Sequence, residues 1–361
     1  MKRWLKLLDL YVLKKFLVTF FYGILIFAII ACVIDYSQKI DDFVENKAPL
    51  NAILFYFLNF IPHIIALLFP LFIFISTIFF TSRMAYKTEI IAMLAAGMSF
   101  RRFLRPYMVG AFLLCGGSFI ANHYIVPLSN QAINDFHVDY IWSKKVGSDN
   151  NIHMRLDEKE YVYFGNFNFD KQEGRRFTKE IIEGNLLKEK IAAENIKYVD
   201  STNSWWLYEV EIRNNNGLNE TWELKDSMEL HLALKPKDLD DDERIKETMN
   251  TPVLKKFIET QKKRGRENVN FYWIEYHKRT AQPFAGLILT IMGASIGMQK
   301  IRGGSGLHIA IGIVASALYM FFFQFAQTFS TNLGTNPLLA VWIPNIIFGI
   351  ICLILFYKRV K

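Results

Sequence analysis

Long uncharged apolar runs occupy both ends of the chain, whereas residues 128–277 are polar and of mixed charge. A membrane-spanning helix needs about 20 mostly apolar residues. Six stretches meet this requirement, three before the polar stretch and three after it. They are residues 16–34, a segment within 48–82, and residues 107–126, 281–298, 307–329 and 338–357. The pattern predicts six membrane helices with a large domain inserted between the third and the fourth.

The first apolar run is expected to be a retained span rather than a cleavable signal. It continues uncharged from Phe16 to Ile34, which is longer than the apolar core of a typical signal peptide. No convincing small-residue cleavage site ends it.

The inserted domain is predicted to consist mainly of β-strands. Residues 160–169 alternate aromatic and polar side chains, and short runs at 191–200, 204–217 and 221–234 are separated by Asn, Gly and Ser. Because no helical pattern interrupts these runs, an antiparallel sandwich or β-jelly roll is favoured over an α/β domain. Residues 238–266 are charged and have a helical pattern, which predicts a helical connector back to the membrane.

These patterns define three segments. Residues 1–127 carry the first three spans, residues 128–277 form the outer domain, and residues 278–361 carry the last three spans. The outer domain contains 23 Lys and Arg residues against 28 Asp and Glu, whereas the rest of the chain contains 19 against 6. The net charge of +8 therefore belongs to the membrane part, and nothing in the sequence resembles a nucleic-acid module.

Basic residues also predict the orientation, because they gather on the cytoplasmic side of short connections. Four basic groups fall on one side of a six-span protein: Lys2, Arg3, Lys6, Lys14 and Lys15; Arg83, Lys87, Arg101, Arg102 and Arg105; Lys300 and Arg302; Lys358, Arg359 and Lys361. Both termini are therefore expected in the cytoplasm. Lys278 and Arg279 run against this rule, although a long translocated domain is largely exempt from it.

The sequence offers little support for catalysis or metal binding. It contains no G-x-x-x-x-G-K-[ST], H-E-x-x-H or G-x-S-x-G motif and no pair of carboxylates within a span. Cys32, Cys115 and Cys352 all lie in apolar runs, which excludes a disulfide framework or a Cys-based zinc site in the outer domain. We expect no catalytic residue, no metal site and no cofactor bound by this chain.

The connection between the second and third spans predicts a short helix over residues 83–97, lying across the membrane face. Ser82 can cap its start, and Gly97 can end it in the left-handed conformation. Such a helix is suited to docking into a groove of a partner, with Glu89 as a polar anchor. Its apolar patch is formed by Ile90, Ile91 and Leu94. A solvated charge on an interfacial helix remains the alternative for Glu89.

The segment "TEIIAMLAAGMS" resembles the coupling-helix motif of the LptF/LptG family of lipopolysaccharide export permeases: Glu, a short apolar stretch, Ala-Ala-Gly and a polar residue. Other landmarks of the family are resembled, in order, by "IKYVDSTNSWWLYEVEI", "EYHKRTAQPFAGLILTIMGASIG", "RGGSGLHIAIGI" and "NPLLAVWIPNIIFGI". The order and spacing of these motifs extend the resemblance over essentially the whole chain.

The resemblance implies a permease subunit of an ABC transporter in the inner membrane of a Gram-negative bacterium. An LptF-like and an LptG-like subunit pair there, each with six spans and a periplasmic β-jelly roll. A cytoplasmic LptB-like ATPase dimer, which uses ATP and Mg, docks on their coupling helices. Lipopolysaccharide then passes to LptC-like and LptA-like bridge proteins. The residues implied at the ATPase interface are Glu89, Ile90, Leu94 and Gly97.

Lys39, Lys278 and Arg279 are the candidates for contacts with lipid phosphates, since a basic side chain gains a charge-assisted contact there. For Lys39 the alternative is local pairing with neighbouring acids, and for Lys278 and Arg279 it is simple interfacial anchoring. A rival function from another class is a non-transport membrane scaffold that tethers periplasmic partners. Such a scaffold needs no helix for coupling to an ATPase.

Overall fold

The computed structural model divides the chain into two compact units. The helical unit comprises Met1–His137, Lys246–Leu254 and Asn270–Lys361, and the β unit comprises Val138–Ile245 and Lys255–Val269. The structure describes residues 7–141, 148–157, 159–169, 171–184, 186–200, 202–215, 219–232, 234–239, 245–263, 269–299 and 306–360. Several residues used above lie outside these ranges: Lys2, Arg3, Lys6, residues 240–244 and 264–266 of the connector, Lys300, Arg302 and Lys361.

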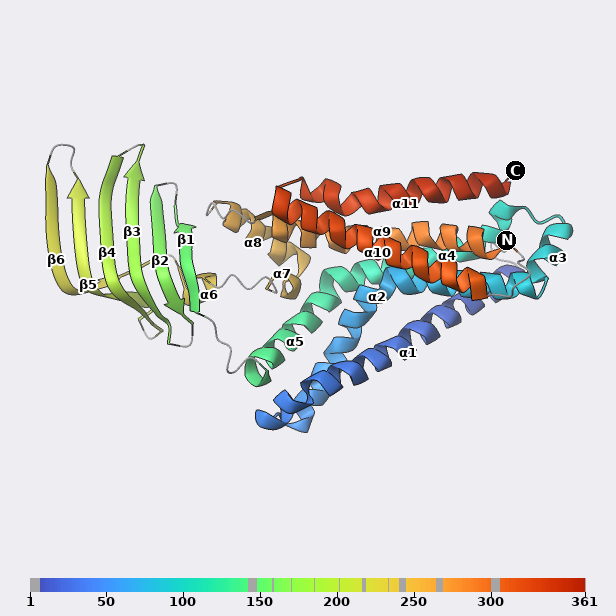
Figure 1. Cartoon of the computed structure of the whole chain (residues 1–361), viewed down its shortest axis with the longest axis horizontal. Coiled ribbons are helices and arrows are strands. Elements are labelled where there is room, and N and C mark those ends of the chain that lie inside the picture. The colour runs from blue at the N-terminus through green and yellow to red at the C-terminus, as the bar shows by residue number, and fades with distance from the viewer. Residues whose placement is uncertain are drawn as a thin grey trace, which may run out of the picture. The chain divides into compact units, whose positions relative to one another are not determined.

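Long helices build the helical unit (Figure 1). They are α1 (Leu7–Glu45), α2 (Leu50–Tyr86), α4 (Phe100–Ile120), α5 (Val126–Tyr140), α9 (Val269–Gly297), α10 (Gly306–Leu333) and α11 (Pro337–Val360), with the short helix α3 (Glu89–Ala95) between α2 and α4. In the described residues, six helices are long and apolar enough to cross a membrane, with α4 and α5 counted as one. The prediction of six candidate spans is confirmed.

The third span is longer than predicted. It was expected to end at Val126, before Pro127, but helical structure continues to Tyr140. A one-turn π-helix, η1 (Ala121–Ile125), ends two residues before this proline. A proline inside a helix removes one backbone hydrogen bond, and a π turn is one of the local adjustments by which a helix passes such a point. Pro127 therefore lies within the helix instead of ending it.

The predicted connector is present as short helices. α6 (Pro236–Leu239), α7 (Ile245–Thr248) and α8 (Thr251–Lys263) precede α9. α9 itself begins at Val269, twelve residues before the predicted start of the fourth span at Ala281. The start of α9 therefore lies well ahead of Lys278 and Arg279.

Small residues let α9 pack closely on its neighbours. A Cβ atom added at Gly286 would lie 2.7 Å from Cys115 Sγ of α4 and 2.9 Å from Phe69 Cε1 of α2. At Gly293, seven residues further, it would lie 3.1 Å from Thr77 Cβ of α2. Apolar burial gives little driving force between helices in lipid, so close backbone approach of this kind holds membrane helices together.

The β unit contains one antiparallel sheet of six strands in the order of the sequence, β1-β2-β3-β4-β5-β6. The strands are β1 (Ser148–Arg155), β2 (Glu160–Asn168), β3 (Glu173–Glu183), β4 (Leu186–Val199), β5 (Ser204–Asn215) and β6 (Glu220–Leu230). The predicted antiparallel β domain is present. The two-sheet arrangement of a jelly roll is not confirmed, because every described neighbour in the sheet is also a neighbour in sequence.

One face of this sheet is apolar. Trp205 of β5 is fully buried, and its indole Nε1 donates to the Leu234 carbonyl at 2.8 Å. Side chains alternate between the two faces of a strand, so residues three apart are expected on opposite faces. Leu207 and Val210 are three residues apart, yet both are buried. Glu209, with φ of 56°, accounts for this break in alternation, because a residue in that conformation shifts the following side chains to the other face.

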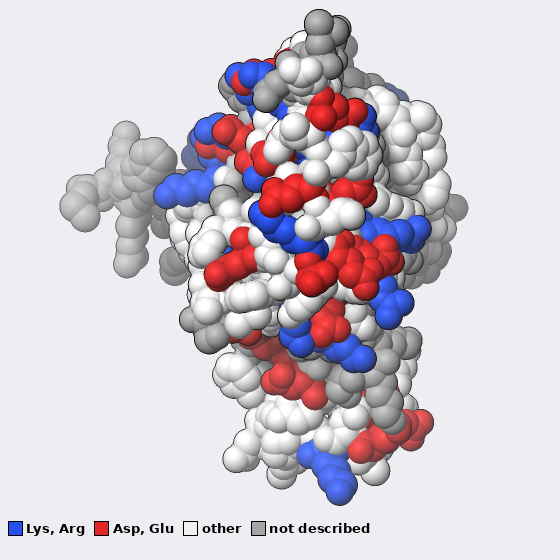
Figure 2. Space-filling model, turned by 90° about the vertical axis from the view of Figure 1, so that its left-hand side faces the viewer, with Lys and Arg blue, Asp and Glu red and all other residues white. Residues whose placement is uncertain are grey.

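β6 is exposed along most of its length. Figure 2 views the molecule from the left-hand side of Figure 1, the side on which β6 lies. Lys and Arg side chains are interspersed with Asp and Glu on the face shown there, without a large area of one sign. Such a mixed surface gives no electrostatic footprint for nucleic acid.

We predict that Gly286→Val destabilises the helical unit, because its side chain would overlap Cys115 and Phe69. Overpacking of this kind costs roughly 1–3 kcal/mol. Gly117→Val in α4 is the matched control, since nothing lies within 4 Å of an added Cβ there. Thermal unfolding of the purified full chain in detergent should show a lower midpoint for Gly286→Val alone. Equal midpoints for both variants would contradict the packing described for α9.

Candidate functional sites

The segment around Glu89 folds as a shorter helix than predicted. α2 continues to Tyr86, and α3 begins only at Glu89. Ser82 therefore lies inside α2, where its hydroxyl donates to the Phe79 carbonyl at 3.1 Å, and its predicted capping role is wrong. Thr88, with φ of 61°, makes the break between the two helices.

The predicted left-handed end of this helix is confirmed. Gly97 has φ of 83°, which a residue without Cβ adopts at little cost. Its amide donates to the Leu94 carbonyl at 2.9 Å, and the Met98 amide donates to the Met93 carbonyl at 3.2 Å. This pair of bonds is the Schellman arrangement that closes a helix. Ser99 then caps the start of α4 by accepting from the Arg102 amide at 3.3 Å.

The two faces of α3 have different surroundings. Ile90 is only 1% exposed and belongs to the apolar core of the helical unit, with Leu94 partly buried against the same core. Ile90 therefore holds α3 in place and is not available to a partner in this conformation. Ile91, which the spacing argument placed in the same patch, is 48% exposed. Glu89 is half-buried and accepts a hydrogen bond from the Tyr11 hydroxyl of α1 at 3.3 Å.

Lys39 lies in a polar cluster that joins three helices. Its ammonium is 2.7 Å from Asp35 Oδ1, 2.6 Å from the Tyr56 hydroxyl and 3.3 Å from His137 Nε2. The Tyr56 hydroxyl donates in turn to Asp35 Oδ2 at 2.7 Å. This geometry favours the local-pairing alternative for Lys39. No sequence pattern pointed to Tyr56 and His137, because they lie on α2 and α5, far from Lys39 along the chain.

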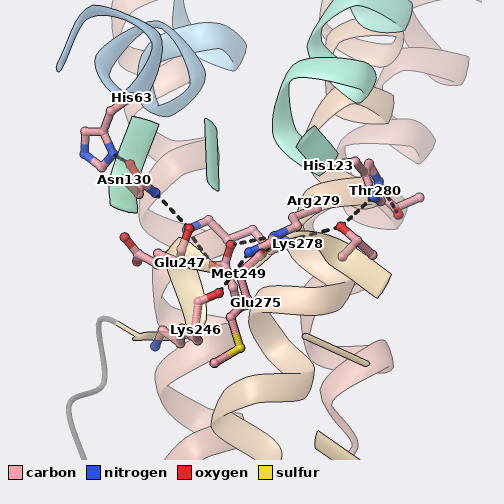
Figure 3. Close-up of polar contacts among 11 residues, drawn as sticks. His63, His123, Asn130, Lys246, Glu247, Met249, Glu275, Lys278, Arg279 and Thr280 are labelled. Atoms are coloured by element: carbon pink, nitrogen blue, oxygen red, sulfur yellow. Dashed lines mark hydrogen bonds and ion pairs between the residues drawn. The ribbon is translucent and has the colours of Figure 1, made fainter. Parts of the chain in front are cut away.

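Arg279 is the centre of a second polar cluster (Figure 3). Its side chain is 3% exposed. The guanidinium donates to the Met249 carbonyl at 2.7 Å and to the Lys246 carbonyl at 2.9 Å, and it lies 3.2 Å from Glu275 Oε1. Arg279 thereby fastens residues 246–251, the segment that returns towards α9. It is not exposed to headgroups as its position in the sequence suggested.

Other helices hold the same returning segment. A hydrogen bond of 2.8 Å joins His123 Nδ1 of η1 to the Thr251 hydroxyl, and Asn130 of α5 donates to the Glu247 carbonyl at 3.3 Å. His63 of α2 is 2.7 Å from the Asn130 side-chain oxygen. Figure 3 shows these groups on both sides of Arg279. The histidine inside the second span is thus a polar packing group, as its neighbour Asn130 indicates.

Lys278 differs from Arg279 in its exposure. The Lys278 ammonium is 3.4 Å from Glu275 Oε2, and the Lys278 side chain is 26% exposed. It lines a cavity of about 310 Å³ whose other polar groups come from α2, η1, α5, α7 and α9. They include His63, Asn122, Asn130, Glu247, Glu275 and Gln282. Arg279 lines the same cavity, and Lys278 is the more exposed of the two basic residues there.

The fold and these sites define a class of protein. The described residues form a multi-pass helical unit with a separate β unit, and they contain no group of His, Cys, Asp or Glu that could hold a metal ion. A protein-family model described as lipopolysaccharide export system permease LptF/LptG matches residues 10–358. The chain therefore belongs to the LptF/LptG family. No curated protein matches it significantly. Since the family consists of permeases, the chain is a transporter subunit rather than an enzyme.

We predict that Lys39→Ala destabilises the protein by roughly 1–3 kcal/mol, because Asp35 would lose its cation in a partly buried site. The double variant Asp35→Asn/Lys39→Ala removes both charges and should recover part of this loss. Thermal unfolding in detergent measures both effects. A double variant less stable than Lys39→Ala would contradict the pairing.

We predict that Arg279→Lys loosens residues 245–251, because an ammonium cannot reproduce the fork that reaches two carbonyls. Hydrogen exchange of peptides from this segment should rise severalfold in the full chain. Lys278→Gln is the control, since Lys278 makes no described hydrogen bond to the segment. Unchanged exchange in Arg279→Lys would refute its role as a fastening residue.

Proposed function

We propose that this chain is one of two six-span subunits of an ABC-type exporter of lipopolysaccharide. The observation that carries the proposal is the family match over nearly the whole chain. The short helix α3 between two candidate spans supports it, because one of its faces is exposed and an exporter powered by a separate ATPase needs such a docking element. The second subunit would be an LptF-like or LptG-like paralogue.

We infer that the protein lies in the inner membrane of a Gram-negative bacterium with both termini in the cytoplasm. The start of α1, α3 and the end of α11 lie at the same end of the helical unit (Figure 1). Basic residues cluster at these positions, as the positive-inside rule requires of a cytoplasmic end. They include Lys14, Lys15, Arg83, Lys87, Arg101, Arg105 and Lys358. The β unit is then periplasmic.

The proposed role of α3 is to dock in a groove of an LptB-like ATPase dimer, which binds and hydrolyses ATP with Mg. Ile91 supplies an exposed apolar contact, and Glu89 supplies a carboxylate at the same helix. Ile90, Leu94 and Gly97 act by fixing the position and the end of α3 rather than by direct contact. This division of roles follows from the burial of Ile90 and the backbone conformation of Gly97.

The proposed route of the lipid runs from the helical unit to the β unit. Lys278 is the preferred contact for a lipid phosphate, since it keeps exposure beside an open cavity. We propose that the β unit is the family's jelly-roll-type domain and receives the lipid. The outer edge of β6 presents backbone donors and acceptors suited to strand addition by an LptC-like or LptA-like bridge protein.

The experiment that tests this function is purification in mild detergent through a C-terminal tag, followed by mass spectrometry of co-eluting proteins and lipids. We expect an ATPase subunit, a six-span paralogue and lipopolysaccharide. Glu89→Ala should reduce recovery of the ATPase severalfold, since its carboxylate would be missing from the interface. Lys14→Ala, also a charge removal on the basic side, should not.

One result would contradict the exporter, and another would contradict only the role of Glu89. Recovery of periplasmic proteins without an ATPase would favour the non-transport scaffold. Full ATPase recovery with Glu89→Ala would leave the exporter intact but remove Glu89 from the docking interface.

A further inference from the structure

Two contacts join the first turns of α1 to the two flanks of α3. Asp9 Oδ2 is 2.7 Å from Arg102 Nη2, in the first turn of α4. The Tyr11 hydroxyl donates to Glu89 Oε2, at the first residue of α3, at 3.3 Å. Asp9 and Tyr11 are two residues apart, whereas their partners lie 93 and 78 residues away in sequence. A short stretch of α1 thus holds the whole α3 segment at its start and beyond its end.

These two contacts differ in strength. Asp9 is 3% exposed, so its pair with Arg102 is a charge-assisted bond in a nearly closed site. Removing the Asp9 carboxylate takes this bond from Arg102, whose side chain is 21% exposed. The Tyr11–Glu89 bond is longer and lies at the surface, where a competing donor can replace it at little cost.

Glu89 also has room to change partner. A cavity of about 230 Å³ adjoins the Tyr11–Glu89 contact, between α1, α2 and the start of α3. Basic side chains line it, and none of them forms an ion pair within the described part of the chain. They are Lys15, Arg83 and Lys87. The carboxylate of Glu89 can therefore leave the Tyr11 hydroxyl and still lie beside basic side chains.

We propose that Asp9 is a positioning residue that transmits the motion of the α3 segment to α1, and that Tyr11 holds Glu89 until an ATPase docks. This inference rests on the proposed docking of an ATPase on α3. A cationic donor of that ATPase replaces Tyr11 at Glu89, while the Asp9–Arg102 pair keeps α1 attached to the segment that moves. α1 has 39 residues and is therefore about 58 Å long. At its far end, Asp35 and Lys39 attach it to α2 and α5.

The effect of the Asp9–Arg102 pair on the α3 segment can be measured on the full chain alone, in lipid nanodiscs, by hydrogen exchange of residues 88–102. Asp9→Asn should raise exchange in this segment about tenfold. The charge swap Asp9→Arg/Arg102→Asp should restore most of the protection, because it re-forms the pair. Tyr22→Phe is the matched control on α1, since Tyr22 is 69% exposed. Unchanged exchange in Asp9→Asn would overturn the proposal.

Transmission is tested in the reconstituted complex by lipopolysaccharide released per ATP hydrolysed. We expect Asp9→Asn and Tyr11→Phe to keep ATP hydrolysis within about twofold, while release per ATP falls by more than half for Asp9→Asn. The swapped pair should recover this ratio, and equal protein recovery for all variants separates a loss of transmission from a loss of folded protein. An unchanged ratio in Asp9→Asn would overturn the relay. Failure of the wild-type chain to bind any ATPase would instead overturn the proposed function.

Discussion

The close packing of α9 against α2 and α4 is the interaction on which the rest of the helical unit depends. Arg279, Gly286 and Gly293 follow one another at intervals of seven residues, or about two helical turns, so they lie along one face of α9. Where this face carries glycine, it approaches other helices. Where it carries arginine, it meets carbonyl groups of the returning segment. One face of a single helix therefore fixes both the bundle and the segment that leads back into it.

The number of spans and the antiparallel β domain could be predicted because both depend on regular patterns in the sequence. An uncharged run of sufficient length specifies a membrane helix almost irrespective of its neighbours. Ends of elements depend on local exceptions that such patterns do not contain. Pro127 has the chemistry of a stop but follows a π turn, and Ser82 has the chemistry of a cap but lies inside a helix that continues.

The candidate sites were predicted less completely, since their geometry depends on contacts between distant residues. Helical spacing groups Ile90 with Leu94 but does not tell which face of α3 points inward. Arg279 was interpreted as exposed because it stands at the start of an apolar run. Its partners are main-chain carbonyls at Lys246 and Met249, which carry no sequence signature. These bonds give Arg279 a structural role that does not depend on which side of the membrane it lies.

The π turn η1 sets the rotational phase between the two halves of one membrane crossing. Each residue of an α-helix advances the side-chain direction by about 100°. The π turn takes one residue more than a turn of α-helix, and the helix after it keeps its phase because the turn absorbs that residue. The same residues wound as a regular α-helix would turn everything after them by that angle. Asn130 would then leave His63, and His137 would leave Lys39. The π conformation of this short segment therefore decides which polar side chains of α5 meet their partners.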